Sequence, residues 1–204
     1  MNKKGFTMAE VLITLAIIGV IAAMTLPTLI SDTTSAQIGP KLAKAVASFE
    51  QANEVLLTAN ASDTLSEAGV IKSKDIYFTE LTKYLKGNNS TSGRFDTKDG
   101  MSIYIEEIDT TSIDSTDPAY KQRIGTIVID INATSKPNAS GSDKFYFSWW
   151  NDGSLRPKGA IDWDGNGQED PWNNYCPLAE KGSVSNPDYC AGHIFENNLK
   201  VLYR

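Results

Sequence analysis

Residues 6–30 form a nearly unbroken apolar run, and this run limits what the chain can fold into more than any other feature. Its single ionisable residue is Glu10. At about 1.5 Å per residue, a helix of this length would be roughly 37 Å long, enough to cross the hydrocarbon core of a membrane. Lys3 and Lys4 precede the run, and basic residues favour keeping that end in the cytoplasm. We therefore expect the residues after the run to lie across the membrane from the cytoplasm.

Three interpretations of this run compete, and Glu10 distinguishes among them. The run is a secretory signal peptide removed near Ala22 and Ala23, a plain membrane anchor, or a helix that stays on the mature chain after cleavage ahead of it. A carboxylate costs about 2.5–3.5 kcal/mol at the centre of a membrane, and a signal peptide or a simple anchor has no use for one. Glu10 therefore favours the third interpretation.

The segment 3–27 resembles the N-terminus of the type IV pilin superfamily, which includes the pseudopilins of type II secretion. The shared features are a basic leader that ends in Gly5, then Phe6, then Glu10 as the fifth residue after Gly5, and Pro27 late in the apolar run. The resemblance implies that a prepilin peptidase cleaves between Gly5 and Phe6. It also implies that the new amine of Phe6 is methylated.

Cleavage at this position gives Glu10 a partner of opposite charge. In a bundle of such helices, Glu10 of one subunit can neutralise the Phe6 amine of its neighbour, which makes both charges less costly in hydrocarbon and sets the axial register. Pro27 removes one backbone donor and is expected to bend or locally melt the helix. Small residues let neighbouring helices approach closely; they are Ala16, Gly19, Ala22 and Ala23.

The helical pattern continues beyond the membrane segment. We predict one long, broken helix over residues 6–58, with an interruption or a kink at Gly39-Pro40, an apolar first half and an amphipathic second half. The amphipathic half needs a surface to pack against, and we expect the C-terminal domain to provide it. Apolar residues recur there at spacings of three and four, namely Ile38, Leu42, Ala45, Val46, Phe49, Ala52 and Leu56.

The rest of the chain, residues 59–204, is predicted to form one small domain. Residues 101–107 alternate between apolar and polar side chains, residues 125–131 are rich in β-branched side chains, and residues 143–150 are aromatic, so each segment is typical of a strand. A short helix is expected within residues 74–87. Residues 87–93 are expected to form a loop.

The predicted architecture is therefore an α+β, pilin-like fold. Residues 1–5 are the leader, residues 6–58 form the long helix with its membrane and filament segment at 6–30, and residues 59–204 form an extracytoplasmic globular domain. A small antiparallel sheet in that domain is expected to lie over the helix.

Residues 128–147 carry a second resemblance, to a stretch found in many pilin-like proteins of type II secretion. The pattern is D-x-N, a Pro-Asn turn, and G-x-D before an aromatic strand, with Ala133 where glycine is expected. Turn chemistry alone explains it as a hairpin connection with polar capping side chains, whereas the resemblance favours a role in type II secretion. The residues of the pattern are Asp130, Asn132, Pro137, Asn138, Gly141 and Asp143.

Residues 162–170 are the best candidate metal site. Calcium takes six to eight oxygen ligands, and alternating Asp and Asn side chains around a glycine turn can supply them. The loop departs from an EF-hand because position twelve is Asn173, so a surface turn rich in Asp, Asn and Gly is the alternative. Known calcium-binding loops near the C-terminus of major pseudopilins favour calcium by analogy of location. The candidate ligands are Asp162, Asp164, Asn166, Gln168 through its carbonyl, and Asp170.

Cys176 and Cys190 are the two cysteines of the chain. Outside the cytoplasm, two cysteines this close in sequence most often pair, so we expect a disulfide in preference to two free thiols. Together with the single histidine, His193, they are too few for a four-ligand zinc site. The sequence shows no nucleophile–base arrangement, and we do not expect an enzyme. The net charge of −6 argues against a broad nucleic-acid surface.

These features predict a structural subunit of a type IV pilus-like filament or of a type II secretion pseudopilus. Its expected partners are copies of itself, other pilin-like subunits, the prepilin peptidase and the bacterial inner membrane. The C-terminal domain is expected in the periplasm before assembly, and the filament at the cell surface afterwards. The alternative is a membrane-anchored periplasmic binding domain that does not polymerise, in which Glu10→Ala would change nothing.

Overall fold

The structure is a computed structural model of the chain. It describes residues 5, 7–91, 93–109, 122–133, 135–160, 176 and 186–200, with the backbone alone at 27, 28, 30–35 and 89–91. The chain divides into two compact units, Met1–Gln37 and Ile38–Arg204. The division falls inside the longest helix.

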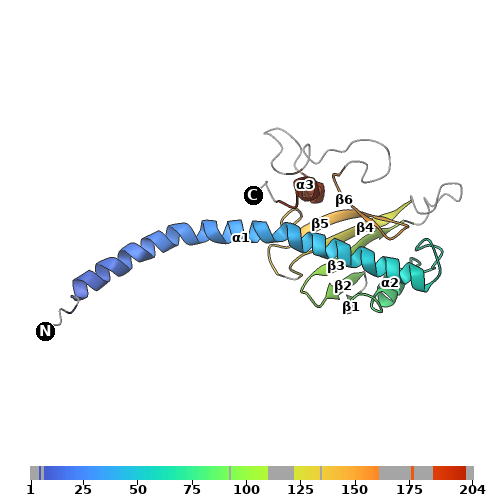
Figure 1. Cartoon of the computed structure of the whole chain (residues 1–204), viewed down its shortest axis with the longest axis horizontal. Helices are drawn as coiled ribbons and strands as arrows, with labels where there is room; N and C mark the ends of the chain where they lie inside the picture. Colours follow the sequence, from blue (N-terminus) through green and yellow to red (C-terminus); the bar gives the residue numbers. More distant parts are fainter. Residues whose placement is uncertain are drawn as a thin grey trace. The chain divides into compact units, whose positions relative to one another are not determined.

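This helix, α1, runs over Met8–Ala59 (Figure 1). Its segment Met8–Leu26 is long and apolar enough to cross a membrane once, with a mean hydropathy of 2.3. The helix continues through Gly39-Pro40, so an interruption there is wrong, whereas a kink at that point stays a prediction. Pro27 does not end the helix either, and a bend at Pro27 stays a prediction.

The second half of α1 packs through the face that the sequence predicted. All seven apolar residues of that face are buried, with between 0% and 7% of their surface exposed. Spacings of three and four place them on one side of the helix, where they contact the core of the second unit. Phe49, for example, lies with its ring centroid 6.1 Å from that of Tyr77 and 6.5 Å from that of Trp149.

One antiparallel sheet of six strands forms the other layer of this unit in the described part of the chain. The strands follow one another in chain order, so each pairs with its sequence neighbour. They are β1 (Gly87–Thr91), β2 (Arg94–Thr97), β3 (Ser102–Ile108), β4 (Arg123–Asp130), β5 (Lys144–Trp150) and β6 (Leu155–Pro157). The three predicted strands correspond to β3, β4 and β5, and the predicted α+β class is confirmed.

The predicted loop over residues 87–93 is wrong, because β1 lies there. Its residues have low strand propensity, but the β1 backbone pairs with β2, as in the register of Asn88 with Asp96. Gly87 is required for this pairing, since a Cβ atom there would collide with the Phe95 ring and the Asp96 carbonyl. The close approach of the two backbones therefore decides the local structure. A strand-propensity scale does not include this effect.

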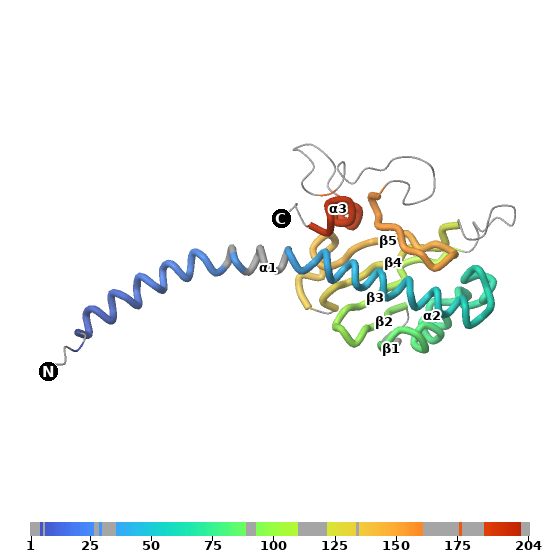
Figure 2. The backbone as a smooth tube through the Cα atoms, viewed as in Figure 1, coloured from blue at the N-terminus to red at the C-terminus, as the bar shows by residue number. Residues whose placement is uncertain are grey.

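Alternation along the central strands directs one set of side chains into the core. Phe145, Phe147 and Trp149 on β5 are almost fully buried, as are Ile127 and Ile129 on β4. The C-terminal half of α1 crosses this face of the sheet (Figure 2). The short helix α2 (Lys74–Leu81) lies inside the range predicted for it and begins at an N-cap serine. A single-turn helix (Pro187–Tyr189) leads into α3 (Cys190–Glu196), which contacts β5 and β6.

Candidate functional site

The N-terminal end of α1 holds the residues that the sequence marks for processing and assembly. The helix begins at Met8 because Thr7 and Glu10 form a capping box. The backbone N–H and the hydroxyl of Thr7 both donate to Glu10 Oε2 at 2.8 Å, and the N–H of Glu10 donates to Thr7 Oγ1 at 3.3 Å. Gly5 precedes this cap, and Phe6 lies outside the described residues.

The role of Thr7 was missed in the sequence analysis, although the pattern T-x-x-E before an apolar run is its signal. Within the described residues, both bonds to the Glu10 carboxylate end on Oε2. This leaves Oε1 available for a donor from another chain. The N–H of Thr7 belongs to the peptide bond with Phe6, so cleavage after Gly5 would leave the capping box in place. Helix capping and pairing with a neighbouring amine are therefore compatible roles for one carboxylate.

The apolar side chains that follow Glu10 are exposed in the single chain. Met8 is 80% exposed and Leu12 is 63% exposed, and none of the Met8–Leu26 span is buried. A Cβ atom built on Gly19 would meet no other atom within 4 Å, so its face is open to the backbone of another helix. Such a surface is stable only in lipid or against other apolar helices.

The β4–β5 connection contains the second motif, and Asp143 organises it. The Asp143 carboxylate accepts the backbone N–H groups of Asn138 and Ala139, both at 2.7 Å, and the Asn132 amide at 3.0 Å. Ala133 has φ of 56°, a left-handed conformation that favours glycine, which explains why glycine is expected there. The described residues of the motif thus form a hairpin connection held by polar side chains, as turn chemistry predicted.

Asp130 lies at the end of β4, next to this connection, and is fully buried. Its Oδ1 accepts the N–H of Asn132 at 3.1 Å, whereas its Oδ2 has no hydrogen-bond partner among the described residues. The pKa of Asp130 is raised to about 6, chiefly by burial and in smaller part by the charge of Asp143, while the Asn132 bond and the charges of Lys144 and Arg94 act in the opposite direction. Folding therefore disfavours the ionised form of Asp130 relative to its protonated form.

The predicted disulfide is confirmed, because Cys176 and Cys190 are bonded with their Cα atoms 5.1 Å apart. Cys190 is the first residue of α3 and is fully buried. Gly141 in the β4–β5 connection lies against it, since a Cβ atom at that position would be 3.2 Å from Cys190 Sγ. The disulfide, α3 and the second motif therefore meet at one place.

The candidate calcium ligands lie outside the described residues. These are Asp162, Asp164, Asn166, Gln168 and Asp170. In the ranges that the structure does describe, no group of three or more His, Cys, Asp or Glu side chains is arranged to hold a metal ion. Calcium binding at residues 162–170 stays a prediction.

The fold and the N-terminal site define an α+β protein of pilin-like arrangement, with one apolar N-terminal helix and an antiparallel sheet. Residues 1–26 match a family model described as the prokaryotic N-terminal methylation motif. The chain therefore carries a type IV pilin-like prepilin signal. No curated protein and no solved structure matches the chain significantly.

Proposed function

We propose that this chain is a structural subunit of a type IV pilus-like or type II secretion pseudopilus filament. The observation that carries the proposal is the exposed apolar span Met8–Leu26, which begins beside Glu10 and follows a methylation motif. Before assembly this span requires lipid, and in a filament it requires the corresponding spans of other subunits. Processing then requires the prepilin peptidase as a partner, and assembly requires neighbouring pilin-like subunits.

In the proposed mechanism, cleavage after Gly5 exposes a charged amine on Phe6. The Oε1 atom of Glu10 accepts from the amine of the adjacent subunit, while Oε2 keeps its two bonds to Thr7. Pairing of the two charges offsets the cost of holding each in apolar surroundings and selects one axial register between helices. The proposal assigns binding and positioning to these residues and no catalytic step.

Among filaments of this class, we favour a type II secretion role because of the motif in residues 128–147. Its capped connection lies against the disulfide and α3, so the motif contributes to the shape of the C-terminal part of the domain. A pilus that serves adhesion or DNA uptake is the second candidate within the same class. The competing function is a membrane-anchored binding domain that never polymerises.

Mass spectrometry of the mature chain tests the processing step. We expect a chain that begins at Phe6 and carries one added methyl group. A mature chain that lacks residues 6–30 would refute the proposal, because the helix that builds the filament would be missing.

The assembly step is tested with Glu10→Gln, which keeps an oxygen that can accept the Thr7 bonds but removes the charge. We expect this variant to be processed and inserted into the membrane at normal levels, and to yield no filaments in the sheared fraction. The matched control is Glu106→Gln, an exposed glutamate on β3, which should assemble normally. Normal filaments from Glu10→Gln would refute the role given to the Glu10 charge and indicate a different assembly contact, whereas a wild-type chain that is processed but forms no filaments would support the non-polymerising alternative.

A further inference from the structure

The second unit has an open groove beside α1, which we call the lysine groove. It has a volume of about 580 Å³, and its lining includes Ala45 and Ala52 of α1 and Met101 at the start of β3. Lys83, Lys86 and Lys98 also line it. The groove therefore combines an apolar lining with ammonium groups.

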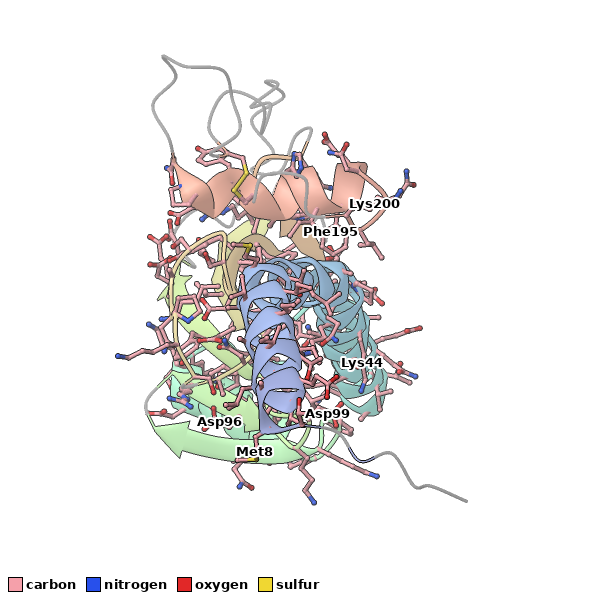
Figure 3. The ribbon with its side chains drawn as sticks, turned by 90° about the vertical axis from the view of Figure 1, so that its left-hand side faces the viewer. Met8, Lys44, Asp96, Asp99, Phe195 and Lys200 are labelled. Carbon is pink, nitrogen blue, oxygen red and sulfur yellow. A yellow bond between two sulfur atoms is a disulfide. The ribbon has the colours of Figure 1, made fainter. Side chains whose placement is uncertain are left out.

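The charge of the lysine groove is positive although the chain as a whole carries −6. Asp99 is the one carboxylate in its described lining, and Lys44 pairs with it at 2.5 Å (Figure 3). Lys83 pairs with Glu80 at 2.6 Å. Lys86 and Lys98 are exposed, and neither has a carboxylate within salt-bridge distance among the described residues.

A second hollow lies around the C-terminal end of α1, and we call it the acidic hollow. It has a volume of about 440 Å³, and its lining includes Glu54, Asp63 and Asp152. Glu67 adds a fourth carboxylate, because its Oε2 accepts the backbone N–H of Asp63 at 3.3 Å. No lysine or arginine is among the described residues that line this hollow. All four carboxylates are exposed, and none of them forms a salt bridge with another described residue.

The two surfaces lie at different positions along and around α1 and share no lining residue among those described. Ala52 lines the lysine groove and Glu54 lines the acidic hollow. At about 100° per residue, positions two apart on a helix are roughly 160° apart around its axis. A contact between the two surfaces therefore requires two copies of the chain.

We propose that the acidic hollow of one copy docks on the lysine groove of the next copy. This inference rests on the proposed filament function and names one of its lateral contacts. The lysine groove concentrates positive charge and the acidic hollow concentrates negative charge. Docking of one on the other is therefore favoured, whereas contact between two grooves or between two hollows is disfavoured by repulsion. Because the two surfaces differ and lie at different positions, the contact is heterologous and can repeat from copy to copy without closing, as a helical filament requires.

Charge reversal on the full-length chain, expressed with its assembly machinery, tests the contact. One variant carries Lys86→Glu and Lys98→Glu, a second carries Glu54→Lys and Asp63→Lys, and a third combines all four changes. All four side chains are exposed, so the changes should leave the fold intact. The measurement is the fraction of subunit in sheared filaments relative to the membrane pool.

We expect each two-residue reversal to reduce the filament fraction at least tenfold and the combined variant to restore it. The control is Lys136→Glu with Lys200→Glu, which changes the net charge as the lysine reversal does but at exposed positions that line neither surface, and it should assemble like the wild type. If the two reversals assemble like this control, while Glu10→Gln does not assemble, the inference fails and the proposed function stands.

Two other results would also overturn the inference. If both reversals lose assembly and the combined variant does not recover it, the two surfaces bind something other than each other, such as an acidic segment of a different protein. If the wild-type chain is processed normally but forms no filaments, the proposed function fails and the docking contact fails with it.

Discussion

Asn53 is a buried polar residue that joins α1 to the rest of the domain. Its side chain is fully buried and bonds to two other parts of the fold. Its Nδ2 donates to the carbonyl of Gly153, after β5, at 2.8 Å, and its Oδ1 accepts the hydroxyl of Tyr77 on α2 at 2.5 Å. Burial raises the pKa of Tyr77 well above its ordinary value, so the hydroxyl stays a donor at any physiological pH.

The variant Asn53→Ala would leave the Tyr77 hydroxyl and the Gly153 carbonyl buried without partners. A buried polar group that loses its partner costs about 1–3 kcal/mol, so we expect the free energy of unfolding to fall by about 2–5 kcal/mol. That is a large part of the roughly 5–15 kcal/mol that stabilises a typical domain. Tyr77→Phe leaves only one orphaned group, Asn53 Oδ1, and should cost about 1–3 kcal/mol.

The double variant decides whether this reasoning is right. In Asn53→Ala with Tyr77→Phe, only the Gly153 carbonyl is left without a partner, because the Tyr77 hydroxyl and Asn53 Oδ1 are both absent. The two single losses should therefore sum to about 2 kcal/mol or more above the loss in the double variant. Urea unfolding of the full chain in detergent gives the free energies. The Trp149 ring lies with its centroid 4.5 Å from that of Tyr77, so near-ultraviolet circular dichroism reports on this site. Strict additivity, or a loss below about 0.5 kcal/mol for Asn53→Ala, would refute the account.

Three further predictions concern acid, redox and metal. The pKa of Asp130 is about 6 in the folded chain, against an ordinary 3.8, so the folded state binds the Asp130 proton more tightly than the unfolded state does. Protonation of Asp130 therefore adds to the free energy of unfolding below about pH 4, and this addition is lost as the pH rises through 6. Asp130→Asn should therefore be more stable than the wild type by about 1–3 kcal/mol at pH 7.5 but not at pH 4, measured by urea unfolding. Cys190→Ser should lower the free energy of unfolding by roughly 3 kcal/mol, and a reductant should then have no further effect. A calcium chelator should lower the melting temperature, and Asp164→Ala should abolish that response; an unchanged melting temperature would reject the site at residues 162–170.

The sequence predicted the parts of the fold that depend on hydrophobic periodicity. The buried face of α1 and the three central strands follow directly from spacings of three and four and from β-branched or aromatic side chains. β1 was not predicted because its pairing depends on backbone contact at Gly87, and the polar sequence of that strand resembles a loop. Gly39-Pro40 was expected to interrupt or kink α1; the helix is not interrupted, because the burial of Ile38 and Leu42 on either side holds it against the domain despite the missing helical bond.

At the candidate site, the sequence identified Glu10 from its cost in an apolar run. The charge of Glu10 alone does not indicate that Thr7 shares the carboxylate, although the T-x-x-E capping pattern in the same stretch predicts it. The disulfide followed from spacing and compartment alone. The lysine groove and the acidic hollow could not be predicted, since each gathers residues from segments that only the fold brings together.

The two edges of the sheet restrict how this protein can associate. β1 carries no apolar side chain and has an irregular register with β2, and β6 is three residues long and ends in Pro157. Short, irregular or proline-terminated edges are poor templates for an added strand. Under the proposed function, subunits held together in a membrane would resist cross-β aggregation, and their contacts in a filament would form through side chains, which can separate again.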